Sequence, residues 1–206
     1  MQAITDLIMY FQKGGLVMWP LLACSITVIA IAIERFIYYK SVDSGAAFAS
    51  HYCAAVRSGD FAVATELARK GSGQCAQMLA DVEAVAGGKA EKSAFLESRA
   101  GIFMATLRDK LDYLGIIVTM SPLLGLLGTI VGMIGAFSIF NVEAGAPMAI
   151  TGGIGEALIA TATGLCVAIL SLCAHSYFAH RMDNIITDME QCFSALLEAE
   201  TRRARS

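Results

Sequence analysis

The acidic residue Glu156 stands at the start of a long apolar run, and helix packing alone does not explain its chemistry. Residues 157–174 carry no Asp, Glu, Lys or Arg. If this run crosses a membrane, a carboxylate at its edge costs several kcal/mol unless the group faces protein or water. Two interpretations follow. Glu156 either begins a helix at the outer surface, where the helix dipole favours an anion, or lines a polar space inside the membrane.

Three threonines extend the second interpretation. Thr161 and Thr163 follow Glu156 in the same run, and Thr129 lies in an earlier apolar run. Hydroxyl groups can hold water or the proton-bearing group of a partner, so these four residues are the candidate ion-coupling site. Helical geometry places Thr163 nearly above Glu156 but turns Thr161 about 140° away. Glu156 and Thr161 therefore cannot both face the centre of one pore.

Small residues form a stripe along the run 114–142. Steps of three, four and seven return to the same face of a helix. In lipid, such a face lets two backbones approach closely, which drives helix association. The candidate helix-packing residues are its glycines, Gly125, Gly128, Gly132 and Gly135, and a similar stripe in the next run comprises Gly152, Gly153, Glu156, Ala160, Thr163 and Ser171.

The elements that must position these residues are three uncharged runs, at 16–33, 114–142 and 157–174. The chain has 56% hydrophobic and 16% charged residues and a mean hydropathy of +0.62, unlike a water-soluble globule. About 20 apolar residues span about 30 Å of hydrocarbon as a helix. The sequence therefore predicts an all-α integral membrane protein with three transmembrane helices.

Lys and Arg are distributed unevenly around these runs. None occurs in 141–153, between the second and third runs, whereas the long first connection and the tail hold most of them. Because cytoplasmic connections carry an excess of Lys and Arg, we place the N-terminus outside the cytoplasm and the C-terminus inside. Lys13, before the first run, is a weak exception.

These signals divide the chain into seven segments. We predict a periplasmic amphipathic helix (1–13), transmembrane helix 1 (14–38), a cytoplasmic helical domain (39–112), transmembrane helix 2 (113–141), a periplasmic loop (142–152), transmembrane helix 3 (153–178) and a cytoplasmic helical tail (179–206). No basic residue precedes position 13 and no small-residue cleavage site follows at the usual distance, so a cleaved signal peptide is not expected.

The sequence of the first connection predicts several short helices. Turn signals lie at 44–45, 58–60, 71–73 and 87–88. From Ala90 onward no Pro and no Gly pair occurs before the second run, so one helix is expected to continue into the membrane. Apolar residues from Met182 to Leu197 recur at steps of three and four, which predicts a helix that continues beyond the third run. Long helical extensions are thus expected in the cytoplasm.

Little in the sequence points to an enzyme. The six cysteines show no CxxC pair, and His51, His175 and His180 are scattered. No nucleophile with a neighbouring base and no phosphate-binding loop occurs. We expect reduced thiols, His175 and His180 near the inner interface, and no cofactor, metal or nucleic-acid partner.

Two sequence blocks nevertheless resemble a known family. Residues 121–137 read SPLLGLLGTIVGMIGAF and residues 155–165 read GEALIATATGL, which is similar to the signature of the MotA/TolQ/ExbB proton-channel family. The opening GGLVMWP at 14–20 and the Glu34-Arg35 pair resemble the ExbB branch in particular. One departure occurs after Ile169, where many relatives have a proline and this chain has Leu170.

The resemblance implies a subunit of an ion-driven motor in a bacterial inner membrane. ExbB-like subunits form a ring, expected to be a pentamer, whose pore is lined by the second and third spans. The pore holds the single transmembrane helices of an ExbD- or TolR-like partner, which brings a proton-carrying aspartate. By resemblance Thr129, Glu156 and Thr161 match pore-facing positions, and the motor delivers work through a TonB-like protein.

Other functions stay open on the sequence. A TolQ-like subunit would use the same motor to maintain the cell envelope rather than to energise nutrient uptake. A passive membrane scaffold would use the small-residue stripes only for packing. The sequence does not separate H⁺ from Na⁺ as the coupling ion, because hydroxyls and a carboxylate suit both.

Overall fold

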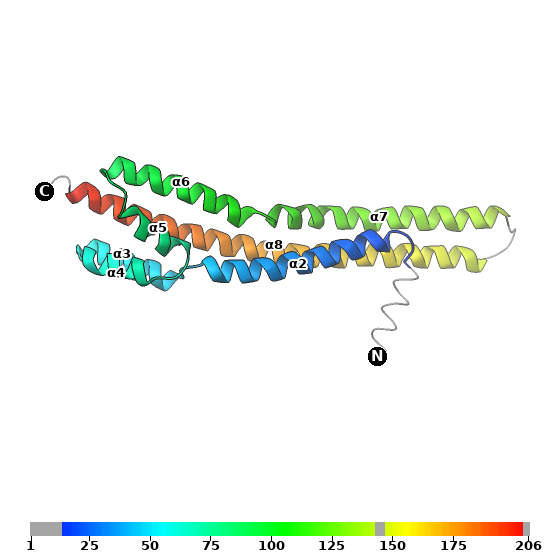
Figure 1. Ribbon diagram of the computed structural model, residues 1–206. Helices are drawn as coiled ribbons and strands as arrows, with labels where there is room; N and C mark the ends of the chain where they lie inside the picture. Colours follow the sequence, from blue (N-terminus) through cyan, green and yellow to red (C-terminus); the bar gives the residue numbers. More distant parts are fainter. Residues whose placement is uncertain (1–13, 143–146, 204–206) are drawn as a thin grey trace. The chain divides into compact units, whose positions relative to one another are not determined.

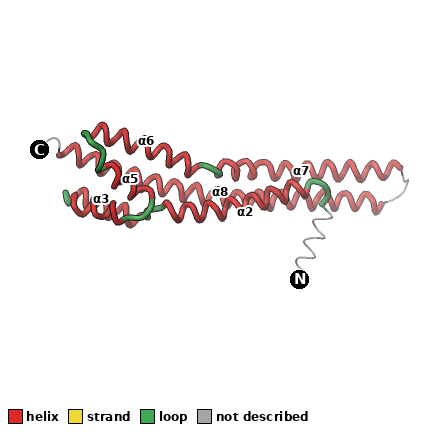
Figure 2. Tube along the Cα trace, in the orientation of Figure 1, coloured by secondary structure: helices red, strands yellow, loops and turns green. Residues whose placement is uncertain are grey.

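The computed structural model describes residues 14–142 and 147–203. Every regular element within these residues is a helix (Figure 2). The predicted helix over 1–13 and the centre of the predicted loop over 142–152 lie outside the described residues. Three helical stretches among the described residues are long and apolar enough to cross a membrane, which confirms the all-helical class and the number of candidate spans.

Seven described helices follow one another along the chain (Figure 1). They are α2 (Met18–Val42), α3 (Ala46–Ser58), α4 (Phe61–Lys70), α5 (Gln74–Val82), α6 (Lys89–Arg108), α7 (Leu111–Val142) and α8 (Pro147–Arg203). They belong to two compact units, and both α2 and α8 contribute residues to each unit.

The first unit contains the start of α2, the whole of α7 and the first part of α8. Val17, Met18 and Leu21 at the start of α2 are at most 6% exposed and pack with Leu124 of α7. Pro20 falls in the first turn of α2, as expected, because a proline there removes no hydrogen bond from the helix. Outward-facing Leu and Ile side chains on α2, α7 and α8 stay exposed in the single chain.

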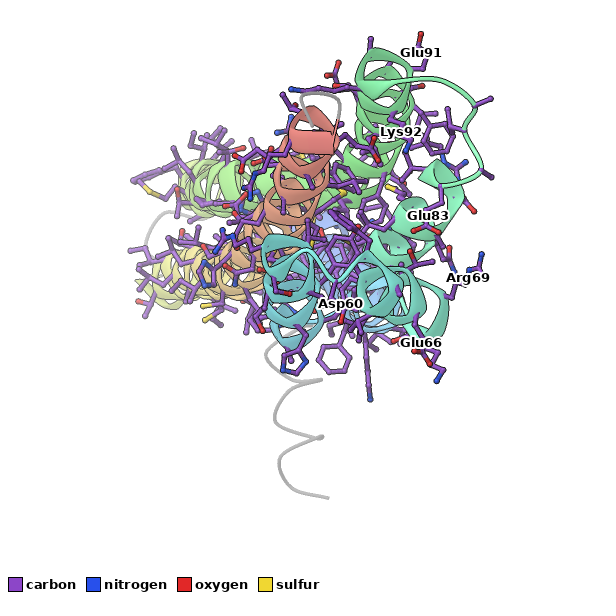
Figure 3. The ribbon with its side chains drawn as sticks, turned by 90° about the vertical axis from the view of Figure 1, so that its left-hand side faces the viewer. Asp60, Glu66, Arg69, Glu83, Glu91 and Lys92 are labelled. Atoms are coloured by element: carbon purple, nitrogen blue, oxygen red, sulfur yellow. The ribbon has the colours of Figure 1, made fainter. Side chains whose placement is uncertain are left out.

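The second unit gathers α3, α4, α5 and α6 with the last parts of α2 and α8. Its interior contains Tyr52, Met78, Leu79, Leu96 and Met189, each at most 3% exposed. The unit joins segments that are distant in sequence: the Lys92 ammonium on α6 lies 2.9 Å from the Glu200 carboxylate on α8. Figure 3 shows Glu66, Arg69 and Glu91 pointing away from these helices, which marks a solvated rim.

The four predicted turns of the first connection are confirmed. The helices α3, α4, α5 and α6 each begin directly after one of the Gly- and Ser-containing segments that the sequence marks. Gly59 ends α3 at φ 81°, and Asp60 caps α4 by accepting a 3.2 Å hydrogen bond from the Val63 amide. Gly59 is suited to its position because glycine readily adopts a left-handed backbone conformation, and Asp60 is suited to its own because its carboxylate accepts a hydrogen bond from a free amide of the first turn.

The expected continuous helix from Ala90 into the second span is wrong. The helix α6 ends at Arg108, Asp109 is extended with ψ 140°, and Lys110 has φ 66°. In the second unit, α2 supplies the donors that stabilise this end: Arg35 Nη1 donates to the Thr106 carbonyl at 3.0 Å, and the Tyr39 hydroxyl donates to the Leu107 carbonyl at 2.7 Å. Long-range contacts therefore satisfy carbonyls that a continuing helix would have satisfied locally.

The helix beyond the third run is continuous, as expected. The helix α8 extends over 57 residues without a break. It begins at Pro147, earlier than the predicted start at residue 153, because proline is well suited to the first helical position.

Candidate functional site

Glu156 lies in the first unit on α8, half-buried against the chain segment that precedes α2. A Cβ atom built on Gly15 would overlap Oε1 of Glu156 and lie 2.8 Å from its Cδ atom. Gly15 has φ 71°, a conformation that favours glycine. The carboxylate thus packs directly on the backbone of the turn.

Thr161 connects the two membrane-type helices of the first unit. Its hydroxyl on α8 donates a 3.1 Å hydrogen bond to the Gly125 carbonyl on α7. A hydrogen bond between helices is favourable where water is excluded, and it fixes the register of α8 on α7. Thr161 therefore faces α7, as its rotation away from Glu156 implies.

Thr129 and Thr163 satisfy their hydroxyls within their own helices. Thr129 donates to the Leu126 carbonyl at 2.6 Å, and Thr163 donates to the Ile159 carbonyl at 2.8 Å. Both side chains are half-buried. Within the described residues, the hydroxyls of all three threonines donate to backbone carbonyls and not to Glu156, so a single chain holds them as separate groups.

The glycine stripe of α7 lies against α8 of the same chain at three of its four positions. Built Cβ atoms would lie 3.1 Å from the Thr161 Cα at Gly125, against the Ala160 Cβ at Gly128, and 3.1 Å from the Gly153 carbonyl at Gly132. At Gly135 no atom lies within 4 Å of such a Cβ. A bulky residue at Gly132 would therefore separate α7 from α8 of the same chain.

One glycine of this helix pair, Gly164, is not among the packing residues predicted from the sequence. A Cβ on Gly164 would lie 2.6 Å from the Ser121 carbonyl and 3.0 Å from the Gly125 Cα. Gly153, Ala157, Ala160 and Gly164 follow at steps of four, three and four, so the signal was present in the sequence. Gly153 and Ala160 also belong to the stripe that includes Glu156, so Gly164 extends that stripe along α8.

Two serines are completely buried in this unit. The Ser171 hydroxyl on α8 donates to the Leu114 carbonyl on α7 at 3.0 Å. The Ser121 hydroxyl has no hydrogen-bond partner. Neither has the surroundings of a nucleophile, and the described part of the chain contains no group of three or more His, Cys, Asp or Glu residues suited to a metal ion.

The family model of the MotA/TolQ/ExbB proton channels matches residues 72–191, more than half of the chain. The chain belongs to the MotA/TolQ/ExbB proton channel family. The matched region contains Thr129, Glu156, Thr161 and Thr163.

Curated relatives in this family carry both ExbB and TolQ names. A putative ExbB-like biopolymer transport protein of Synechocystis is 34% identical over 79% of this chain and 66% of its own length. A second Synechocystis ExbB-like protein is 31% identical over 78% of this chain and 79% of its own length. A TolQ protein of Haemophilus influenzae is 33% identical, but over 40% of this chain and 37% of its own length. These two ExbB-named matches thus cover more of the chain than the TolQ match, although an ExbB protein of Xanthomonas campestris also matches over 41% of it.

Proposed function

We propose that this chain is the ring-forming channel subunit of a proton-driven motor in a bacterial inner membrane. With an ExbD-like partner, the motor energises TonB-dependent transport across the outer membrane. The observation that carries this proposal is the half-buried carboxylate of Glu156 inside the third candidate span, at the position where the family signature has its acidic residue.

The surroundings of Glu156 are suited to a carboxylate that takes part in ion coupling. The carboxylate is partly accessible in the single chain, and the helix that carries it is apolar on both sides. An ionisable group in such a span is a functional-site candidate by default because its desolvation is costly. In the assembled ring, an expected pentamer, Glu156 lines the path along which the partner's aspartate exchanges protons, with Thr163 on the same side of α8.

The relatives support an ExbB-like role in transport over a TolQ-like role in maintaining the cell envelope. Four relatives with ExbB-type names match over 78% to 87% of this chain, whereas two further ExbB-named relatives and the two TolQ-named ones match over 39% to 41%. Among the named roles, biopolymer transport therefore fits the larger share of the chain.

The test replaces the carboxylate and measures proton flow. The chain is co-reconstituted with an ExbD-like partner in vesicles, and partner-dependent proton flux is recorded for the parent and for Glu156→Gln. We expect Glu156→Gln to lower the flux at least about a hundredfold, because proton transfer by a positioned group is typically worth that much. Membrane level and oligomer size should not change.

Glu198→Gln is the matched control. Glu198 lies on the same helix, with its side chain 71% exposed, so loss of its charge should leave the flux unchanged. Full flux in Glu156→Gln would contradict the coupling role and favour a solvated helix-start residue. Absence of partner-dependent flux in the parent would favour a passive scaffold.

A further inference from the structure

The turn formed by Gly14 and Gly15 encloses the Glu156 carboxylate more tightly than its exposure suggests. The three atoms nearest to a Cβ built on Gly15 are Oε1, Cδ and Cγ of Glu156, with Cγ at 3.3 Å. No atom of another residue is as close. Because Gly15 has a hydrogen atom in place of a side chain, the carboxylate can occupy the space where a Cβ atom would otherwise lie.

This glycine turn is held in place from several sides. A Cβ on Gly14 would lie 2.5 Å from the Met18 Cγ and 3.3 Å from the Ile159 Cγ2, so Gly14 packs between α2 and α8. Ile159 and Glu156 are one turn apart on α8, and both contact the glycine turn. The buried residues Met18 and Leu21 then anchor the start of α2.

A side chain at position 15 would overlap the Glu156 carboxylate, so either the turn or the carboxylate has to move. The turn is tied to the buried start of α2, because Gly14 packs on Met18. The carboxylate is the far end of a flexible side chain and can rotate away. A side chain at position 15 would thus move the Glu156 carboxylate while the surrounding helices stay in place.

We propose that the glycine turn is a seat that positions the Glu156 carboxylate, and that residue 15 must lack a side chain for this carboxylate to reach its working position. Gly15 is then a positioning residue, which acts through Glu156. The proposal rests on the proposed channel function for its effect on proton flow, but the seat itself is a geometric statement about Glu156.

The experiment compares two glycines that both have a positive φ. Gly15→Ala places a methyl group at φ 71° against Glu156, whereas Gly59→Ala places one at φ 81° with no atom within 4 Å of its Cβ. Both variants place an alanine in a left-handed conformation, which costs free energy, but only Gly15→Ala displaces the carboxylate. Partner-dependent proton flux is measured for the full chain with its ExbD-like partner. We expect a loss of at least about tenfold in Gly15→Ala, because a displacement of about 1 Å can cost that much.

A second measurement reads the carboxylate without using the motor. Dicyclohexylcarbodiimide modifies carboxyl groups in apolar surroundings, and mass spectrometry gives its rate of reaction at Glu156. We expect this rate to change several-fold in Gly15→Ala and to match the parent in Gly59→Ala. Glu156→Asp shortens the side chain by one methylene group, so Gly15→Ala/Glu156→Asp should recover flux relative to Gly15→Ala alone.

Several outcomes would overturn the seat. Equal losses in Gly15→Ala and Gly59→Ala would assign the effect to backbone strain, and parental labelling in Gly15→Ala would show that the carboxylate had not moved. No recovery in the double variant would also contradict steric displacement. If Glu156→Gln kept full flux while Gly15→Ala changed the labelling rate, the channel assignment would fail and the geometric seat would remain.

Discussion

Buried hydroxyl groups in the first unit differ in whether a partner satisfies them. Ser171 and Thr161 both donate to carbonyls of α7, and each contact joins two helices. Ser121 is equally buried but its hydroxyl has no partner. An unsatisfied buried polar group costs free energy, whereas a hydrogen bond between membrane helices contributes a modest amount.

Replacing the two buried serines should therefore have opposite effects. We expect Ser121→Ala to raise the free energy of unfolding by about 1 kcal/mol, because it removes an unsatisfied hydroxyl. Ser171→Ala should lower it by about 0.6 kcal/mol, because it removes one interhelical hydrogen bond. Unfolding of the purified protein in mixed detergent micelles measures both. A loss of stability in Ser121→Ala would mean that its hydroxyl has a partner in the assembled protein.

The sequence singled out Glu156 but gave no sign of its contact with Gly15. A charge beside an uncharged run can be read directly from the chain, since its cost depends on the local solvent. The contact joins residues 141 positions apart and depends on a positive φ and on the packing of Met18. Such features arise only when the helices are assembled.

The boundary between α6 and α7 is where helix prediction failed, and the cause is tertiary. Neither Asp109 nor Lys110 is a strong helix breaker of the Pro or Gly type. Arg35 and Tyr39, distant in sequence, supply donors to the last carbonyls of α6. By contrast, the turns of the first connection carried glycine signals and were predicted correctly, because their conformations depend on local backbone preferences.

The Tyr39 hydroxyl should contribute measurably to the second unit. Tyr39→Phe keeps the ring against Phe178 but removes the 2.7 Å hydrogen bond to the Leu107 carbonyl. We expect the free energy of unfolding to fall by about 1 to 3 kcal/mol, because the site is buried. Tyr38→Phe, at the neighbouring half-buried ring, is the control and should change it little. Equal effects of the two variants would contradict the assigned role of the Tyr39 hydroxyl at this helix end.

Charge separates the two compact units of the chain. Of its 15 Lys and Arg residues, all except Lys13 and Lys110 belong to the second unit. This unit also joins the first connection to the tail, through Lys92 with Glu200 and through the Cys192 thiol, 3.9 Å from the Ala49 carbonyl. Segments that pack together must lie on one side of a membrane, and the excess of Lys and Arg favours the cytoplasmic side.

Cysteine labelling can test this orientation with few background changes. Cys24, Cys53, Cys75 and Cys192 are buried, and burial raises the pKa of the Cys53 thiol to about 11. Because the thiolate is the reactive form, Cys53 should label slowly at neutral pH, and burial keeps the reagent away from the other three thiols. Only the exposed Cys166 and Cys173 need replacement by alanine, so the buried core of the second unit stays intact.

Single cysteines are then introduced at Gly145, Arg57 and Arg202 and treated with a membrane-impermeant maleimide. Arg57 and Arg202 are exposed residues of the second unit, so Arg57→Cys and Arg202→Cys should react only when the cytoplasmic face is accessible, in inside-out vesicles. Gly145→Cys lies in the connection without Lys or Arg and should react only in spheroplasts. The reverse pattern would invert the orientation. Labelling of positions 57 and 202 from opposite faces would contradict a three-span chain in which the first connection and the tail form one unit.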